Sequence, residues 1–327
     1  MINLFVPVLF DSNELEITKE YSELIKKSNN IISNICNLEN KFDLLVGNFF
    51  DFQRHLLEIA LSQSLFKREN SILSIARDER DLTRTLYNFL SIAKVYLDLM
   101  PKILENIDAD FAKKMHDEIK YKRETSIREN FNIRLMIALR NHMQHSDFSI
   151  GIQKSISFVS IKEADTINLY NVQVVLNLEK FMTNPSMKKQ FPEGEHLKKD
   201  KIDLTEQILF FYKDLCLIHN RIRNYIKFKQ KECIDLIESA FDFFAKNKNY
   251  IFDSGQQILA ISESDFNDKA ISNLKITILN KNDIKLIEEL QLQNKCDENI
   301  VNQVICNATR NQILRIQNTC NEFKRQT

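Results

Sequence analysis

Residues 42–59 read FDLLVGNFFDFQRHLLEI, and the spacing of their apolar letters decides the fold class. Large apolar side chains recur here at steps of three and four residues, at Phe42, Leu45, Phe49, Phe52, Leu56 and Ile59. Such steps place side chains on one side of an α-helix, because a helix has about 3.6 residues per turn. We therefore predict an amphipathic helix over residues 42–67, with this stripe facing a core.

The same periodicity continues on both sides of this stretch. It predicts helices over residues 14–35, 78–100 and 108–145, and a long helix that Asp203 caps and that runs to about residue 248. Pro101 is expected to end or bend the third helix. The whole chain of 327 residues holds four Gly and four Pro, and sheet-rich proteins need many more for their tight turns. A mainly α protein follows.

Alternating patterns interrupt the helices in two places. Residues 149–161 and 166–178 alternate apolar with polar letters and are rich in β-branched residues, which predicts a β-hairpin near 149–178. Residues 184–201 are expected to form a loop. Beyond residue 251, strands are expected over 257–262 and 274–279, and helices over 283–293 and 298–323. We expect a helical domain over residues 1–250 with a β-hairpin insertion, then a small mixed C-terminal segment over 251–327, of uncertain role.

Charge and cysteine usage narrow the class of protein. The 45 basic and 45 acidic residues give a net charge of zero, so net charge offers no attraction to nucleic acid, although a local basic face can still exist. None of the six cysteines lies in a CxxC pair or at zinc-ligand spacing, which is typical of reduced thiols in an intracellular protein. The start of the chain lacks a basic leader, and no apolar stretch approaches the roughly twenty residues of a membrane span. We expect a cytoplasmic protein without membrane contact.

Most of the chain contains no sequence motif of a catalytic, nucleotide-binding or metal-binding site. The sequence has no glycine-rich phosphate loop, no GxSxG elbow, no HExxH motif and no cluster of acidic residues at metal-ligand spacing. We therefore expect neither a metal site nor a cofactor.

Residues 131–145, FNIRLMIALRNHMQH, are the exception, because polar residues gather at the end of an otherwise apolar helix. Asn141 and His145 lie one turn apart, so they can act on the same ligand atom. Arg140 lies five residues before His145, about 140° round an ideal helix, and needs its long side chain to reach the site. Arg134 shares the seam of Asn141 and His145 and is the better placed arginine by geometry, so both arginines remain candidates.

These residue types suit metal-independent cleavage of RNA. Histidine titrates near neutrality and can accept the proton of a 2′-hydroxyl. Arginine binds phosphate oxygens through a planar fork, and asparagine can orient a phosphate or ribose oxygen. The candidate catalytic residues are Arg140, Asn141 and His145, and the candidate substrate-binding residues are Arg134, His142 and His219.

Other interpretations of the same residues stay open. Arg140 and His145 can be charges that meet the negative end of the helix dipole. His142 and His145 are spaced to share a metal ion, but no third ligand is near in sequence. His219 and the two arginines that follow it, Arg221 and Arg223, either line the same cleft or form a solvated face.

The arrangement Arg140-Asn141, three residues, His145 resembles the RX4–6H motif of the higher eukaryote and prokaryote nucleotide-binding (HEPN) superfamily. Asn141 matches the polar residue that often follows the arginine in that motif. Residues 84–100 (RTLYNFLSIAKVYLDLM), 138–145 (ALRNHMQH) and 211–226 (FYKDLCLIHNRIRNYI) are also similar to uncharacterised bacterial proteins of this type, over roughly residues 40–250.

The resemblance implies a compact helical bundle, often a dimer whose two motifs face each other. Many members are metal-independent endoribonucleases of toxin–antitoxin and phage-defence systems, and others have lost catalysis. We therefore expect an endoribonuclease with RNA as substrate, a homodimer, and a neutralising or sensing protein partner. The alternative is a non-catalytic helical scaffold that binds a protein or RNA, which the neutral net charge favours.

Overall fold

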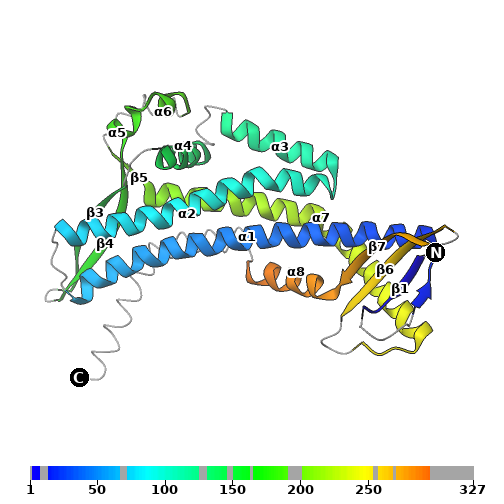
Figure 1. Cartoon of the computed structure of the whole chain (residues 1–327). Helices are drawn as coiled ribbons and strands as arrows, with labels where there is room; N and C mark the ends of the chain where they lie inside the picture. Colours follow the sequence, from blue (N-terminus) through cyan, green and yellow to red (C-terminus); the bar gives the residue numbers. More distant parts are fainter. Residues whose placement is uncertain are drawn as a thin grey trace, which may run out of the picture. The chain divides into compact units, whose positions relative to one another are not determined.

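The computed structural model describes residues 2–7, 14–66, 72–124, 131–145, 150–162, 165–190, 201–252, 257–267 and 270–294. It is mainly helical, with long helices and two small antiparallel sheets (Figure 1), which confirms the expected fold class. The helices are α1 (Lys19–Phe66), α2 (Ile72–Glu105), α3 (Ala109–Glu124), α4 (Phe131–His145), α5 (Leu178–Met182), α6 (Pro185–Gln190), α7 (Leu204–Lys248) and α8 (Lys281–Gln293).

Helix α1 is one continuous helix where the sequence pattern predicted two. The core stripe does not stop between the two predicted helices, because Ile35, Leu38 and Phe42 are all fully buried. The predicted start at residue 14 was also wrong, since Glu14–Glu16 forms strand β2. Helix α2 likewise runs through Pro101 to Glu105, because buried apolar residues continue beyond the proline.

The helix predicted over residues 108–145 is two helices, α3 and α4, and residues 125–130 between them lie outside the described part of the chain. An aspartate caps the start of α3, where the Asp108 carboxylate accepts a hydrogen bond from the Phe111 amide at 3.0 Å. The Asp203 carboxylate caps α7 in the same way, through the Thr205 amide at 2.8 Å. Within residues 184–201, where a loop was expected, α6 occupies Pro185–Gln190 and residues 191–200 lie outside the described part.

The described chain groups by internal contacts into two compact units. Unit 1 contains Met1–Asp43, Leu99–Lys114 and Arg221–Lys295, and unit 2 contains Leu44–Asp98 and Met115–Asn220. Helices α1, α2, α3 and α7 therefore each contribute residues to both units. The domain boundary expected at residue 250 stays a prediction.

Unit 1 joins the two ends of the described chain in one sheet. Its strands are β1 (Ile2–Phe5), β2 (Glu14–Glu16), β6 (Ile258–Asn267) and β7 (Ala270–Asn280), in the order β2-β1-β6-β7 with all neighbours antiparallel. Leu4 of β1 lies opposite Ile261 of β6, and both side chains are fully buried. The strands and the helix expected after residue 251 are confirmed by β6, β7 and α8, whereas the predicted helix over 298–323 lies outside the described residues.

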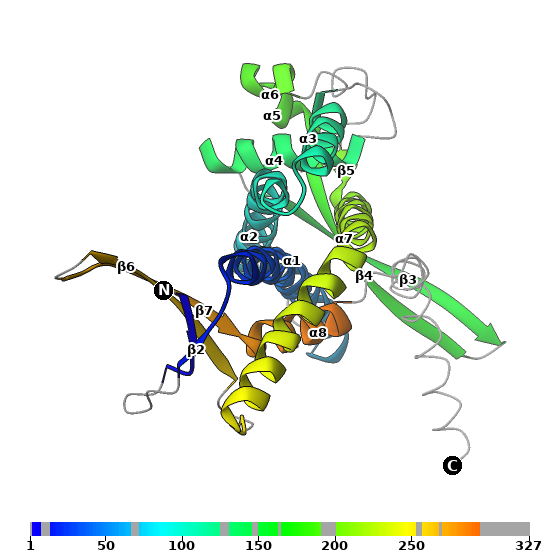
Figure 2. The same ribbon diagram turned by 90° about the vertical axis from the view of Figure 1, so that its right-hand side faces the viewer.

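Unit 2 is built around aromatic contacts between α1, α2 and α7, which lie side by side in Figures 1 and 2. Phe49 of α1 stacks on Tyr212 of α7, with ring centroids 3.7 Å apart, and lies 5.5 Å from Phe89 of α2. The expected hairpin is confirmed by β3 (Gly151–Lys162) and β4 (Asp165–Asn177), to which β5 (Lys201–Asp203) adds a third strand. An ion pair at 2.9 Å between Lys154 and Asp78 connects β3 to α2.

No helix of the described residues combines the length and the apolar character that a membrane-crossing helix requires.

Candidate functional site

Helix α4 lies largely inside unit 2, and this position governs its polar residues. Five of its apolar side chains are buried: Ile133, Leu135, Met136, Ala138 and Leu139. With apolar residues on several faces, the helix leaves few positions exposed, so polar residues among them become buried as well. Among the side chains of α4 that the structure describes, the partly or fully exposed polar ones are Asn132 in the first turn and Arg140, Asn141 and Gln144 in the last two turns.

Arg140 is half-buried and is held by side chains of its own helix. Its Nη1 atom donates to the Asn141 side-chain oxygen at 3.2 Å and to the Gln144 side-chain oxygen. Its Nε atom is buried and has no hydrogen-bond partner among the described residues. Both contacts of Nη1 are neutral amides, so within the described part of the chain no carboxylate neutralises the Arg140 charge.

His145 is the last residue of α4, one helical turn after Asn141. Its side chain, like residues 146–149 that follow, lies outside the described part of the structure. The backbone thus places the two residues in the order that the motif requires. That the His145 side chain contacts a ligand is therefore still a prediction.

His142 is a core histidine in this structure. Its ring meets Phe181 of α5 edge to face, with centroids 5.2 Å apart and an interplanar angle of 71°. Burial lowers the pKa of His142 below its ordinary value, because the charged imidazolium is poorly solvated there. The ring is therefore neutral near pH 7, and it faces α5 rather than solvent.

His219 is fully buried in α7, and its Nδ1 atom lies 2.8 Å from the Tyr96 hydroxyl of α2. This position differs from both expectations for the segment, a cleft or a solvated face. Arg223, four residues later, forms an ion pair with Glu39 of α1, and Arg221 is exposed. The solvated-face interpretation therefore describes Arg221 and not His219.

Arg134 is also buried, more deeply than Arg140. Helix spacing alone favoured Arg134 over Arg140 as the substrate-binding arginine, but spacing does not tell how deeply the side chains on that face of the helix are buried. The structure thus brings Arg140 and Asn141 together at the accessible end of α4. It places Arg134, His142 and His219 in the core, where contact with a substrate would require the surrounding helices to part.

Two further residues of unit 2 escaped the sequence interpretation. Gln144, four residues after Arg140, is one of the two amides that hold the guanidinium, and its i, i+4 spacing was the available signal. Asp214 of α7 is a half-buried carboxyl group whose pKa is raised by burial, against the opposing effect of Lys122 and Lys213. It follows the core residue Phe211 by three positions, and that spacing places it toward the core.

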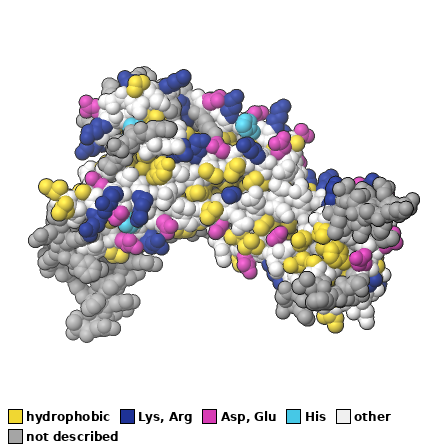
Figure 3. Space-filling model, viewed as in Figure 1, with side chains coloured by type: hydrophobic (Ala, Val, Ile, Leu, Met, Phe, Trp, Pro, Cys, Tyr) yellow, Lys and Arg dark blue, Asp and Glu magenta, His cyan; other side chains and the backbone are white. Residues whose placement is uncertain are grey.

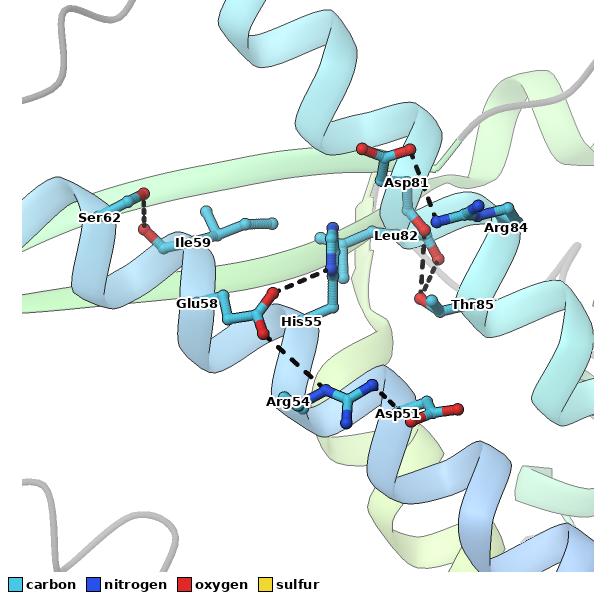
Figure 4. Close-up of polar contacts among 10 residues, drawn as sticks. All are labelled: Asp51, Arg54, His55, Glu58, Ile59, Ser62, Asp81, Leu82, Arg84 and Thr85. Atoms are coloured by element: carbon cyan, nitrogen blue, oxygen red, sulfur yellow. Dashed lines mark hydrogen bonds and ion pairs between the residues drawn. The ribbon is translucent and has the colours of Figure 1, made fainter.

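A second group of polar residues, on α1 and α2 of unit 2, consists of local surface pairs (Figure 4). Arg54 contacts Asp51 at 2.8 Å, and the His55 Nδ1 atom lies 3.5 Å from the Glu58 carboxylate. Exposed pairs of this kind contribute little to stability. Among the described residues, no three His, Cys, Asp or Glu side chains gather in a way that could hold a metal ion.

Charge on the visible surface is mixed. On the face drawn in Figure 3, basic and acidic side chains alternate with small apolar areas over the described residues. This face therefore carries no broad field of one sign, and any anion site on it has to be local.

Comparison with known proteins leaves the chain unassigned to a family. No protein-family model matches it, and neither the curated proteins nor the solved structures give a significant match. Support for a function therefore comes from the chemistry of α4.

Proposed function

We propose that this protein is a metal-independent endoribonuclease of a bacterial defence or toxin–antitoxin system. The observation that carries the proposal is the state of Arg140 at the accessible end of α4. Two neutral amides orient its guanidinium without neutralising it, and one buried N–H lacks a partner within the described residues. An arginine in this state favours an anionic ligand, and a phosphate diester matches its planar fork.

The reaction follows from the residues around that guanidinium. His145 accepts the proton of a ribose 2′-hydroxyl, and the 2′-oxygen attacks the neighbouring phosphorus. The bond from phosphorus to the 5′-oxygen breaks, and that oxygen takes up a proton as it leaves. Arg140 binds the non-bridging oxygens, whose charge grows in the transition state, and Asn141 orients the phosphate or ribose. The products are a 2′,3′-cyclic phosphate and a 5′-hydroxyl.

We further propose that two chains act together, with their α4 helices adjacent. A single set of Arg140, Asn141 and His145 is sparse for phosphoryl chemistry, and a twofold interface doubles it without further sequence. Light scattering at micromolar concentration should report twice the chain mass. A monomer mass would contradict the paired arrangement without affecting the assignment of Arg140.

The test is cleavage of labelled RNA by the full chain in excess EDTA. Arg140→Ala and His145→Ala should each lower the cleavage rate by about a hundredfold or more, as expected for loss of a charge-stabilising or an acid–base group. Arg80→Ala is the matched control, because the Arg80 side chain is 73% exposed on α2, and it should cleave at the parent rate. Loss of cleavage in EDTA, or full activity of both α4 variants, would contradict the proposal.

The second candidate is a non-catalytic helical scaffold, favoured by the burial of Arg134, His142 and His219. Half of the predicted site residues then serve the core, and Arg140 serves as a cation near the negative end of the α4 dipole. In that case the chain yields no RNA fragments under any condition. Arg140→Ala would then change only binding or stability.

A further inference from the structure

The part of α7 that belongs to unit 1 begins with a basic and aromatic stretch. Residues 221–231, RIRNYIKFKQK, contain five basic and two aromatic residues and no acidic residue. Lys227 and Lys231 are exposed, and within the described part of the chain neither forms an ion pair. Acidic residues resume at Glu232, so this local positive charge is confined to about three helical turns.

The two aromatic side chains of the stretch are exposed beside these lysines. Phe228 is 78% exposed and Tyr225 is 49% exposed. At about 100° per residue, Lys227, Lys231, Phe228 and Tyr225 follow one another in that order round one side of α7, within a sector of about 160°. The two aromatic residues are three positions apart, so they lie on neighbouring turns with β-carbons about 5–6 Å apart. We call these four residues the α7 surface, which is cationic on one side and aromatic on the other.

The Tyr225 ring is held in place by the start of α3. It stacks on Phe111, with ring centroids 3.6 Å apart and an interplanar angle of 5°. Its hydroxyl donates to the Asp108 carboxylate at 2.9 Å, and this hydrogen bond raises the pKa of Tyr225, so the hydroxyl stays neutral. Because Phe111 covers one face of the ring, the opposite face is the one that solvent reaches. Asp108 and Asp110 act on Tyr225 from the α3 side, so an anionic ligand is favoured on the lysine side of the surface.

We propose that the α7 surface binds single-stranded RNA, with bases stacked on Phe228 and Tyr225 and phosphates beside Lys227 and Lys231. Exposed rings next to cations are the two elements that single-strand binding requires, and a ring stacks on any base, so little sequence preference is expected. Duplex RNA fits poorly, because its bases are already stacked on one another. A membrane surface would need a broader apolar face than two rings. The inference does not depend on the cleavage proposed for α4, since it concerns binding by unit 1 alone.

Fluorescence anisotropy of the full chain with a labelled, unstructured 2′-O-methyl RNA tests the proposal, because that RNA cannot be cut by 2′-hydroxyl attack. Phe228→Leu keeps an apolar side chain but loses the aromatic face, so Kd should rise at least about fivefold, the loss of one stacked base. Phe228→Tyr keeps the ring and should bind as the parent does. Phe50→Leu is the matched control, because Phe50 is 58% exposed on α1, and it should leave Kd unchanged.

The salt dependence of binding tests the lysine side separately. Lys227→Gln and Lys231→Gln should each weaken binding and lower the slope of log Kd against log salt concentration by about 0.7, the effect of one phosphate contact on a single strand. Phe228→Leu should keep the parent slope, because stacking releases no counterions.

Four results would overturn the proposal. They are a parent chain that binds no RNA at low salt, parental binding by Phe228→Leu, a parental salt slope in both lysine variants, and duplex RNA that competes as well as a single strand. Binding to phosphatidylserine vesicles without binding to RNA would also overturn it and would identify a membrane surface instead.

Discussion

The ion pair between Glu39 and Arg223 gives the sharpest stability prediction for unit 1. The Glu39 side chain is fully buried on α1, and the Arg223 side chain on α7 is 12% exposed. The guanidinium binds the carboxylate through two parallel hydrogen bonds, Nε to Oε1 at 2.9 Å and Nη2 to Oε2 at 2.5 Å. Its remaining Nη1 atom donates to the Asn294 carbonyl at 2.7 Å, so one side chain connects α1, α7 and the end of α8.

Arg223→Met keeps much of the apolar stem and removes every one of these donors. The Glu39 carboxylate then stays buried with its cation gone, and removal of one partner from a buried ion pair costs about 3–5 kcal/mol. We expect the free energy of unfolding to fall by that amount. Urea denaturation followed by far-UV circular dichroism measures it, since the chain has no tryptophan for fluorescence.

Two controls make this prediction refutable. Arg221→Met, at an exposed position of the same helix, should change the free energy of unfolding by about 0.5 kcal/mol or less. The double variant Glu39→Leu with Arg223→Met should be more stable than Arg223→Met alone, because it no longer buries a charge. A loss below about 1 kcal/mol in Arg223→Met, or a double variant less stable than the single one, would refute the reasoning.

Three further predictions concern unit 2. Burial lowers the pKa of His142, so below about pH 6.5 the unfolded chain binds a proton that the folded chain does not, and the stability of the fold should fall as the pH drops. His142→Leu should flatten this fall in thermal melts between about pH 7 and 5, and a melting temperature that falls as steeply as in the parent would contradict the assignment to His142. Asp203→Ala should lower the free energy of unfolding by about 1 kcal/mol in urea titration, because the Thr205 amide loses its acceptor. Asp203→Asn should lose less, because an asparagine side chain can still accept that hydrogen bond, and an equal loss would contradict the capping role. Arg134→Ala should lower the melting temperature by several degrees, because it truncates a buried side chain, and an unchanged melt would place Arg134 outside the core.

Local pattern predicted the helices wherever apolar spacing alone decides the structure. Phe42, Leu45, Phe49 and Phe52 recur at helical steps and are all buried in α1. The apolar spacing did not predict that α1 is continuous between residues 35 and 42, because several polar residues interrupt the apolar pattern there. Glu39 is buried there because Arg223 reaches it from 184 residues away, and local spacing carries no information on such a partner.

Strand β1 was missed for a similar reason. Its four residues, INLF, are too few for an alternating pattern, and they form a strand because they pair with β6 about 258 residues later. The hairpin of β3 and β4 was predictable, since each strand is long and its partner is adjacent in sequence.

The candidate site was predictable in its position but not in its depth. The polar run at the end of α4 identified Arg140 and Asn141, which do contact each other. The same run did not indicate that His142 faces Phe181 or that Arg134 is buried, because the identity of a polar residue does not tell whether its side chain lies in the core or on the surface. His219 finds its partner, Tyr96, 123 residues away, which only the folded chain reveals.

The chemistry of the RNA ends is the most direct test of the proposed function. RNA incubated with the full chain in excess EDTA should yield fragments that end in a 2′,3′-cyclic phosphate and begin with a 5′-hydroxyl, as resolved by mass spectrometry. His145→Ala and Arg140→Ala should yield none above background over the same time. Fragments with 3′-hydroxyl and 5′-phosphate ends, or cyclic-phosphate fragments made equally well by His145→Ala, would contradict the assignment of cleavage to the end of α4.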